Sequence, residues 1–150
     1  MQREYDMNGI FKELKDLAEI LDAYEVYKAC MYMPTKEKYE LRAEEWLQDE
    51  SIKVCAYFDN GTIKGMIVIS IQNCQTAEII GISIDSRFRR QGIGSFMIKQ
   101  IKEKYNIVRL YAETDDGAVA FYTKNGFQST AHTETYNGHS VIRYRCVLTT

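Results

Sequence analysis

The segment from Ile79 to Ser95 has the residue types and spacing of an anion-binding site. It begins as an apolar strand, continues into a loop rich in arginine, and opens an amphipathic helix around Gly92 and Gly94. The first amides of a helix lack partners within the helix, and the helix dipole adds partial positive charge there. Glycine lets a phosphate approach the backbone closely. Three arginines add local positive charge: Arg87, Arg89 and Arg90. The pattern therefore predicts a pyrophosphate site.

Two other nucleotide-binding motifs are excluded by the same residues. A P-loop requires a lysine directly after its last glycine, and Ser95 follows Gly94 here. A dinucleotide-binding fingerprint requires a third glycine, and Met97 stands at that position, three residues after Gly94. The predicted pyrophosphate site therefore belongs to neither class.

A second segment, from Ala118 to Phe127, places Phe121 and Tyr122 on a short helix that ends at Asn125-Gly126. A tyrosine with an ordinary pKa of about 10 is protonated at neutral pH, so its hydroxyl can donate a proton to a leaving group. The same aromatic pair could equally serve only to pack the helix on a sheet. The residues alone leave both interpretations open.

Together, the two segments resemble the GNAT superfamily of acyl-CoA-dependent N-acetyltransferases. The first matches the family signature Q/R-x-x-G-x-G/A through Arg89, Gly92 and Gly94. The second resembles the family pattern A-x-x-F-Y-x-x-x-G-F between Ala118 and Phe127. The resemblance extends over about 52–148, and the first 50 residues match only loosely, as two helices. Two motifs in the family's order are more specific than either motif alone.

The resemblance implies acetyl-CoA as co-substrate and no metal. The loop amides would hold the cofactor pyrophosphate, and the backbone of the preceding strand would pair with the pantetheine arm. The implied cofactor-binding set is Ile82, Ser83, Ile84, Arg89, Arg90, Gln91, Gly92, Ile93, Gly94 and Ser95. Gly81, just before this strand end, suits a bulge. Where the family often has an asparagine that touches the cofactor, this chain has Asp115, which is left out of the set.

The resemblance also implies catalytic roles. Tyr122 would be the acid that protonates the leaving thiolate, and Glu78 would be the base, because burial in an apolar strand raises a carboxyl pKa. Glu113 and water remain alternatives for the base. The amine would attack the thioester directly in a ternary complex, with strand amides around 82–84 donating to the oxyanion. Cys74 and Ser83 are not expected to be nucleophiles, since no histidine lies near either in sequence.

The hydrophobic periodicity predicts the elements that position these residues. The expected helices lie at about 10–30, 36–47, 92–105 and 116–124, and the expected strands at 52–58, 62–71, 77–84, 107–113, 127–135 and 140–148. The order indicates an α/β (α+β) fold with a GNAT-like mixed, mostly antiparallel sheet of about six strands and about four helices. Strand 77–84 is expected to be central and buried on both faces. No strand is expected near the N-terminus, because 1–9 has poor strand character.

Length and composition limit the classes of function. The chain has 150 residues, the size of one domain, with a helical acceptor-side segment expected over 1–50 and an acyl-CoA-binding core over 51–150. Its 19 basic and 21 acidic residues give a net charge of −2, which argues against a nucleic-acid or membrane partner. Four scattered cysteines predict free thiols, mostly buried, and a cytoplasmic location. The two histidines lack metal-ligand spacing.

We therefore expect an N-acetyltransferase, an acyltransferase enzyme that acts on a primary amine of a small molecule or peptide. The alternative is a non-catalytic acyl-CoA-binding regulatory domain, which would have no need of the Tyr122 hydroxyl. The acceptor pocket would be built from 24–39 and 132–139, where five tyrosines could form its walls or simply pack: Tyr24, Tyr27, Tyr32, Tyr39 and Tyr136. A homodimer is compatible with the family. The sequence specifies neither the acceptor nor the acyl-chain preference.

Overall fold

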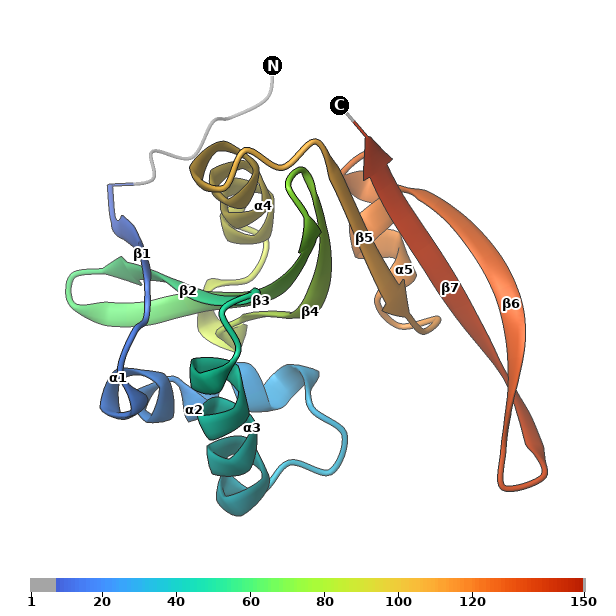
Figure 1. The fold of residues 1–150 in the computed structure, drawn as a ribbon, viewed down its shortest axis with the longest axis horizontal. Coiled ribbons are helices and arrows are strands. Elements are labelled where there is room, and N and C mark those ends of the chain that lie inside the picture. The colour runs from blue at the N-terminus through green and yellow to red at the C-terminus, as the bar shows by residue number, and fades with distance from the viewer. Residues whose placement is uncertain (1–7, 150) are drawn as a thin grey trace.

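The computed structural model describes residues 8–149, which form one seven-stranded sheet in the order β1-β2-β3-β4-β5-β7-β6 (Figure 1). Its strands are β1 (Ile10–Glu13), β2 (Ile52–Asp59), β3 (Thr62–Asn73), β4 (Thr76–Ile84), β5 (Arg109–Thr114), β6 (Gln128–Tyr136) and β7 (His139–Thr149). Neighbouring strands are antiparallel except for β4 and β5, which run parallel. The mixed, mostly antiparallel sheet confirms the predicted fold class, with seven strands in place of about six.

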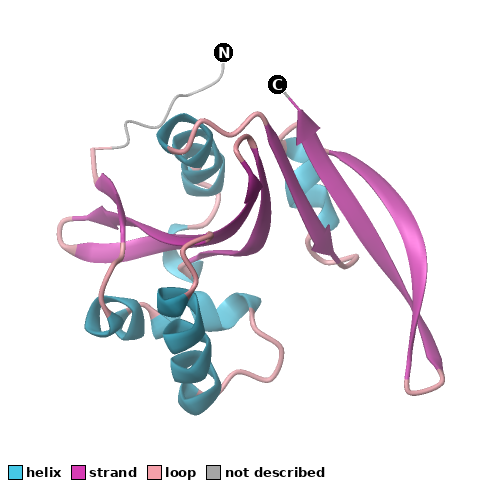
Figure 2. Cartoon of the chain, viewed as in Figure 1, coloured by secondary structure: helices cyan, strands magenta, loops and turns pink. Residues whose placement is uncertain are grey.

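Helices cover both faces of the sheet (Figure 2). They are α1 (Leu17–Asp22), α2 (Tyr24–Tyr27), α3 (Lys36–Gln48), α4 (Ile93–Lys104) and α5 (Val119–Lys124), with short 3-10 turns η1 (Lys28–Cys30) and η2 (Ser86–Phe88). The first three pack on one face, and α4 and α5 pack on the other. None of the helices within 8–149 is long and apolar enough to cross a membrane.

Strand β3, like β2, is buried on both faces. Its successive residues alternate between two core clusters, with Met66 and Val68 under α1–α3 and Ile67 and Ile69 under α4. This alternation follows from the two-residue period of a strand. The prediction that 77–84 is buried on both faces is wrong, because Ile80 in β4 is 42% exposed. The prediction that this strand, β4, is central in the sheet is confirmed.

The predicted helix over 10–30 is replaced by β1 followed by α1, α2 and η1. Ile10 to Glu13 pair antiparallel with Phe58 to Cys55 of β2, so β1 forms an edge of the sheet. Asp16 begins α1 by accepting a hydrogen bond from the Glu19 amide through its side chain. The apolar spacing predicted this helical part correctly, but β1 gains its hydrogen bonds from a strand more than 40 residues away in sequence.

Local signals at turns and helix starts match the structure well. Thr35 caps α3 by accepting a hydrogen bond of 3.1 Å from the Lys38 amide. In the β2–β3 turn, Asn60 and Gly61 have φ of 52° and 73°, the left-handed conformations that a two-residue hairpin turn requires. The Asn137-Gly138 turn between β6 and β7 has the same form.

Candidate active site

The site is built around an opening between β4 and β5 (Figure 1). The two strands pair only from Thr76 to Glu78 with Arg109 to Tyr111, and Ile79 to Ile84 have no strand partner on that side. A register shift against β3, where Ile69 pairs with Ile79 and Val68 with Gly81, places a bulge at Ile80. The bulge adjoins Gly81, as the sequence predicted, and it turns the strand away from β5.

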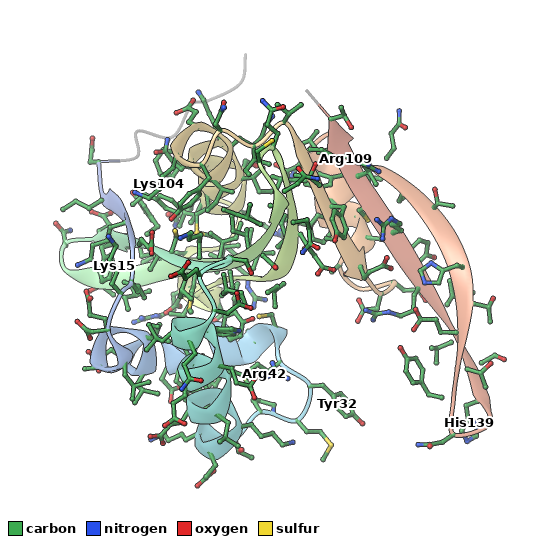
Figure 3. All side chains as sticks on the ribbon, in the orientation of Figure 1. Lys15, Tyr32, Arg42, Lys104, Arg109 and His139 are labelled. Atoms are coloured by element: carbon green, nitrogen blue, oxygen red, sulfur yellow. The ribbon has the colours of Figure 1, made fainter. Side chains whose placement is uncertain are left out.

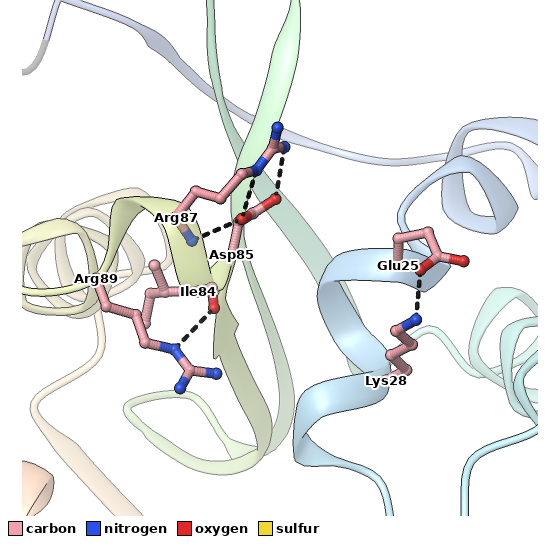
Figure 4. Close-up of polar contacts among 6 residues, drawn as sticks. All are labelled: Glu25, Lys28, Ile84, Asp85, Arg87 and Arg89. Atoms are coloured by element: carbon pink, nitrogen blue, oxygen red, sulfur yellow. Dashed lines mark hydrogen bonds and ion pairs between the residues drawn. The ribbon is translucent and has the colours of Figure 1, made fainter.

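The free edge of β4 presents backbone groups to this opening. The Ile84 carbonyl accepts a hydrogen bond of 3.4 Å from Arg89 Nε (Figure 4). Burial raises the pKa of the Cys30 thiol to about 11, and the Ile82 amide of this edge acts in the opposite direction. The Ser83 side chain points the other way, because its hydroxyl donates a 2.5 Å hydrogen bond to the Val26 carbonyl of α2. The side chains of Ile82 and Ile84 pack into the core under α4, so both residues face the opening only through their backbone.

The loop between η2 and α4 has the geometry of an anion cradle. Arg90 and Gly92 have positive φ, 64° and 79°, and Gly92 caps α4 without a side-chain hydrogen bond. No acidic residue lies in the first turn of α4, so its amides and dipole face no negative charge there. Arg87 contributes less than the sequence predicted, because its guanidinium forms a two-point contact with Asp85 at 3.0 and 3.1 Å (Figure 4).

Three members of the predicted cofactor-binding set also hold α4 in place. A Cβ at Gly94 would lie 2.7 Å from Cε2 of Phe121, so this glycine allows α4 and α5 to approach closely. The Ser95 hydroxyl donates a 2.5 Å hydrogen bond to Asn125 Oδ1, at the end of α5. Ile93 is 2% exposed and its side chain is in the core. An anion could therefore bind these residues through their backbone amides, which lie at the start of α4.

Tyr122 lies on α5, behind β5 and β7, and is 6% exposed. Its ring packs edge-on against Phe127 at 5.2 Å between centroids, and its hydroxyl has no hydrogen-bond partner among residues 8–149. Burial raises the pKa of Tyr122, and the nearby thiols of Cys146 and Cys30 raise it further. Asp115 accepts hydrogen bonds from the Gly117 and Ala118 amides and so organises the start of this short helix. The hydroxyl is therefore protonated and free to bond a ligand, on a ring that is otherwise packed in the core.

Glu78 ends the paired part of β4, at the apex of the opening. Its neighbours Ala77 and Ile79 point into the core under α4, so its side chain lies on the opposite face. Burial raises the pKa of Glu78, Glu113 raises it further, and Arg145 acts in the opposite direction. Among the described residues the Glu78 side chain has no ion pair or hydrogen bond, and no contact joins it to Tyr122.

Glu113, the alternative base, is held in a cluster on the same face. Arg145 donates a 2.9 Å hydrogen bond to its Oε1, and His132 Nε2 lies 3.7 Å from its Oε2. Glu113 Oε2 is buried and has no hydrogen-bond partner within the described part of the chain. His132 also pairs with Glu134 at 3.0 Å. Arg145 thus occupies one oxygen of the Glu113 carboxylate, whereas no cation is paired with the Glu78 carboxylate among the described residues.

Cys30 lies next to β4, and no pattern in the sequence singled it out. It ends η1, which packs against β4, and its thiol donates a 3.2 Å hydrogen bond to the Tyr27 carbonyl. The helix turn that carries this thiol packs against β4, on the side of the sheet covered by α1–α3. Cys30 and Cys74 are exposed and Cys55 and Cys146 are buried, all with free thiols. The signal available in the sequence was the position of Cys30 inside the tyrosine-rich segment 24–39.

The five tyrosines of the predicted acceptor pocket divide into two groups. Tyr27 and Tyr39 are 2% and 1% exposed and pack with Trp46 in the core, and Tyr24 stacks on Tyr39 at 5.4 Å. Tyr32 and Tyr136 are exposed, Tyr32 on the loop before α3 and Tyr136 near the tip of the β6–β7 hairpin that carries His139 (Figure 3). Packing therefore explains the first three, and only the last two remain available to a ligand.

The chain was also compared with known proteins. The acetyltransferase (GNAT) family model matches residues 20–127. No curated protein sequence matches this chain significantly.

Solved structures with the same fold include three acetyltransferases. A GNAT family acetyltransferase from Elizabethkingia anophelis with acetyl-CoA bound has a TM-score of 0.70 and 20% identity, covering 95% of this chain and 99% of its own. The ribosomal-protein-S18-alanine N-acetyltransferase from Escherichia coli gives 0.73 and 16%, with 94% and 93% covered. A spermidine N-acetyltransferase chimera from Vibrio cholerae and hSSAT gives 0.71 and 15%, with 94% and 95% covered.

The sheet opening, the left-handed loop at the start of α4 and the helix that carries Tyr122 lie together in one fold shared with these enzymes. The family model covers most of the chain, including the loop before α4. It ends before the last two strands, β6 and β7. The chain belongs to the acetyltransferase (GNAT) family.

Proposed function

We propose that this protein transfers an acetyl group from acetyl-CoA to a primary amine of a small molecule or peptide, by direct attack in a ternary complex. The observation that carries the proposal is the Tyr122 hydroxyl, which has no hydrogen-bond partner among the described residues although its side chain is only 6% exposed. A domain that only binds acyl-CoA has no need of this hydroxyl, whereas acyl transfer has a leaving thiolate to protonate.

The cofactor would lie along the opening in two parts. Its pyrophosphate would accept hydrogen bonds from the amides between Arg90 and Ser95, with Arg89, Arg90 and Gln91 around it. Its pantetheine arm would pair with the backbone of Ile82 to Ile84, in place of the missing strand partner. When bound, acetyl-CoA supplies the activated acetyl group. The residues of this chain position the cofactor, and they keep another strand from pairing with this edge of β4.

Two side chains would move protons. Tyr122, whose pKa is raised by burial, stays protonated at neutral pH and can donate its proton to the departing thiolate. Glu78, whose pKa is also raised by burial, can take a proton from the incoming ammonium group, directly or through water. The Ile82 amide at the free edge can donate to the oxyanion that develops on the thioester carbonyl. No covalent intermediate is needed, because both substrates would be held together.

Thiol release tests turnover. The protein is mixed with acetyl-CoA, a thiol reagent and a panel of amines that includes polyamines and peptides with free N-termini. We expect amine-dependent release of free CoA. Binding of acetyl-CoA without thiol release on any amine would refute turnover and support the non-catalytic acyl-CoA-binding domain.

A matched pair of variants tests the cradle. Gly92→Asp places a charge and a side chain at the pyrophosphate position, and we expect it to abolish acetyl-CoA binding in calorimetry. Gly138→Asp is the control, because Gly138 has the same φ of 79° at the hairpin tip, and a Cβ added there would meet no atom within 4 Å. The backbone cost of the two substitutions is therefore alike. Unchanged affinity in Gly92→Asp would remove the loop from the binding site.

A further inference from the structure

The half of the sheet formed by β5, β7 and β6 has one face that the described helices leave uncovered (Figure 1). On the other face, Leu110 and Ala112 of β5 belong to the core that includes α4 and α5. Tyr111 and Glu113 alternate with them and therefore project from the uncovered face. The core under α1–α3 contains no described residue of β5, β6 or β7. The side chains on this face are therefore open to a ligand.

Arg145 of β7 is held on this face with most of its hydrogen-bonding capacity unused. Its Nη1 donates a 2.9 Å hydrogen bond to Glu113 Oε1, and its guanidinium carbon lies 4.4 Å from the centre of the Tyr111 ring. Its other N–H groups have no hydrogen-bond partner among residues 8–149, and its side chain is 46% exposed. A planar guanidinium that is fixed on one side and open on the other is suited to binding a carboxylate through two hydrogen bonds.

Unpaired carboxylate oxygens lie next to this guanidinium. Glu78 of β4 and Tyr111 of β5 are partners in the strand register, so their side chains project side by side from the same face, and Arg145 lies over the Tyr111 ring. The Glu78 side chain has no ion pair among the described residues. Glu113 Oε2 is buried without a hydrogen-bond partner, which is rare for a buried polar atom and indicates a missing donor. The face thus presents free acceptors for an ammonium group beside free donors for a carboxylate.

We propose that the acceptor is a free α-amino acid, whose carboxylate binds Arg145 and whose amino group faces Glu78. The inference rests on the function proposed above, because it names the acceptor of that reaction. In an α-amino acid one carbon separates the two charged groups, and Glu78 and Tyr111 stand on adjacent strands about 4.8 Å apart. Glu113 is a positioning residue, because it holds the guanidinium on the Tyr111 ring.

The transfer step balances without a further reactant. The amine nitrogen bonds to the acetyl carbon, and the C–S bond of acetyl-CoA breaks. Of the two protons that the ammonium group loses, one goes to the departing coenzyme A thiolate and the other to solvent. The product is an N-acetylated amino acid that keeps its carboxylate.

Arg143 provides a matched control on the same strand. It lies two residues from Arg145 and therefore on the same face, and it has no ion pair or ring contact among the described residues. The other charges near it are paired with each other, since His132 lies 3.0 Å from Glu134, and Tyr136 also donates a hydrogen bond to Glu134. Arg143 thus has the charge of Arg145 without its fixed position beside Glu78.

Matched acceptors test the inference in the wild type. Thiol release is measured with each of the standard α-amino acids, with its α-amide and with a dipeptide that begins with the same residue. Only the free acid has a carboxylate on the carbon that carries the amine. An amide lowers the basicity of the neighbouring amine, so the reactivity of the amine alone favours the amide. We expect the opposite: for the preferred amino acid, kcat/KM for the acid should exceed that for the amide by about 10-fold or more.

Three variants identify the group that binds the carboxylate. Arg145→Gln should bring the acid-to-amide ratio to one or below, mainly by raising KM for the acid, and should leave the acetyl-CoA Kd unchanged. Arg143→Gln makes the same change of charge and should keep the ratio within about 3-fold of the wild type. In the double variant Glu113→Gln/Arg145→Gln, no charge of the ion pair is left without its partner, and the ratio should stay low. If Arg145 served only to neutralise Glu113, the double variant would regain the ratio.

Each other outcome decides against one of the two proposals. A wild type that acetylates amides, dipeptides or polyamines better than every free amino acid would overturn the acceptor assignment and leave the proposed function in place. A preference for the acid that survives Arg145→Gln, or that returns in the double variant, would also overturn it, because the carboxylate would then be bound elsewhere. Absence of thiol release with every amine, in protein that binds acetyl-CoA, would overturn the proposed function and this inference with it.

Discussion

Gly81 is the position at which a single methyl group should disturb the site most. A Cβ added there would lie 2.2 Å from Tyr27 Oη and 2.8 Å from Tyr27 Cζ. An ordinary contact begins at 3.4 Å, so the two groups must separate by more than an ångström. Tyr27 cannot easily yield, because it is 2% exposed and packs against Trp46 at 5.3 Å between ring centroids.

We expect Gly81→Ala to lower the free energy of unfolding by about 2 kcal/mol, within the range for overpacked cores. For a domain of this size, that corresponds to a fall in Tm of about 4–8 °C. Urea unfolding is the assay, followed by the fluorescence of Trp46, the single tryptophan, which contacts Tyr27 directly.

A double-mutant cycle tests the cause. Tyr27→Phe removes the nearest atom, so Gly81→Ala should cost about 1 kcal/mol less in that background. Gly117→Ala is the control, because its Cβ would approach only the exposed Asp115 carboxylate, at 3.3 Å, and we expect a change within about 0.5 kcal/mol. Wild-type stability in Gly81→Ala, or a coupling energy of zero, would refute the reasoning.

Three further predictions concern the site. Tyr122→Phe should lower kcat by about 10²-fold or more while leaving the acetyl-CoA Kd unchanged, and an unaffected kcat would exclude Tyr122 as the acid. Because burial raises the pKa of Glu78 and a base works only when deprotonated, kcat/KM should fall as pH decreases through a value above the ordinary glutamate pKa of about 4.3. Glu78→Gln should remove that acidic limb from the pH profile; an identical limb in this variant would assign it to another group. Ser83→Ala should lower the free energy of unfolding by about 1–2 kcal/mol in urea, because the Val26 carbonyl loses its donor, and a smaller loss would show that another donor replaces the hydroxyl.

The elements encoded by local signals were predictable from the sequence. Thr35 begins α3, Asn60-Gly61 and Asn137-Gly138 turn the hairpins, and Gly92 begins α4 in the left-handed conformation. Each depends on a side chain or a φ angle within a few residues. Strand β1 was not predictable in this way, because its four residues are stabilised by pairing with β2 far along the chain.

The same distinction holds for the site. The loop from Arg89 to Ser95 and the helix carrying Tyr122 follow from contiguous motifs, so the sequence predicted both. Cys30 approaches the Ile82 amide only because η1 packs against β4, and no local pattern encodes that contact. Gly94 belongs to the loop motif and also leaves room for Phe121 of α5. This second role likewise follows from packing between helices that are distant in sequence.

The opening between β4 and β5 also has a consequence for the solubility of the protein. From Ile79 to Ile84, β4 has no strand partner on one side, so it is a sheet edge in the middle of a sheet, where a side chain, Arg89, bonds the Ile84 carbonyl. Such edges are where separate molecules join by strand pairing and aggregate. The bulge at Ile80 and the divergence of β5 interrupt the regular spacing that an intruding strand would need, and a bound pantetheine arm would cap the edge. We therefore expect the ligand-free protein to self-associate more readily than the protein saturated with cofactor.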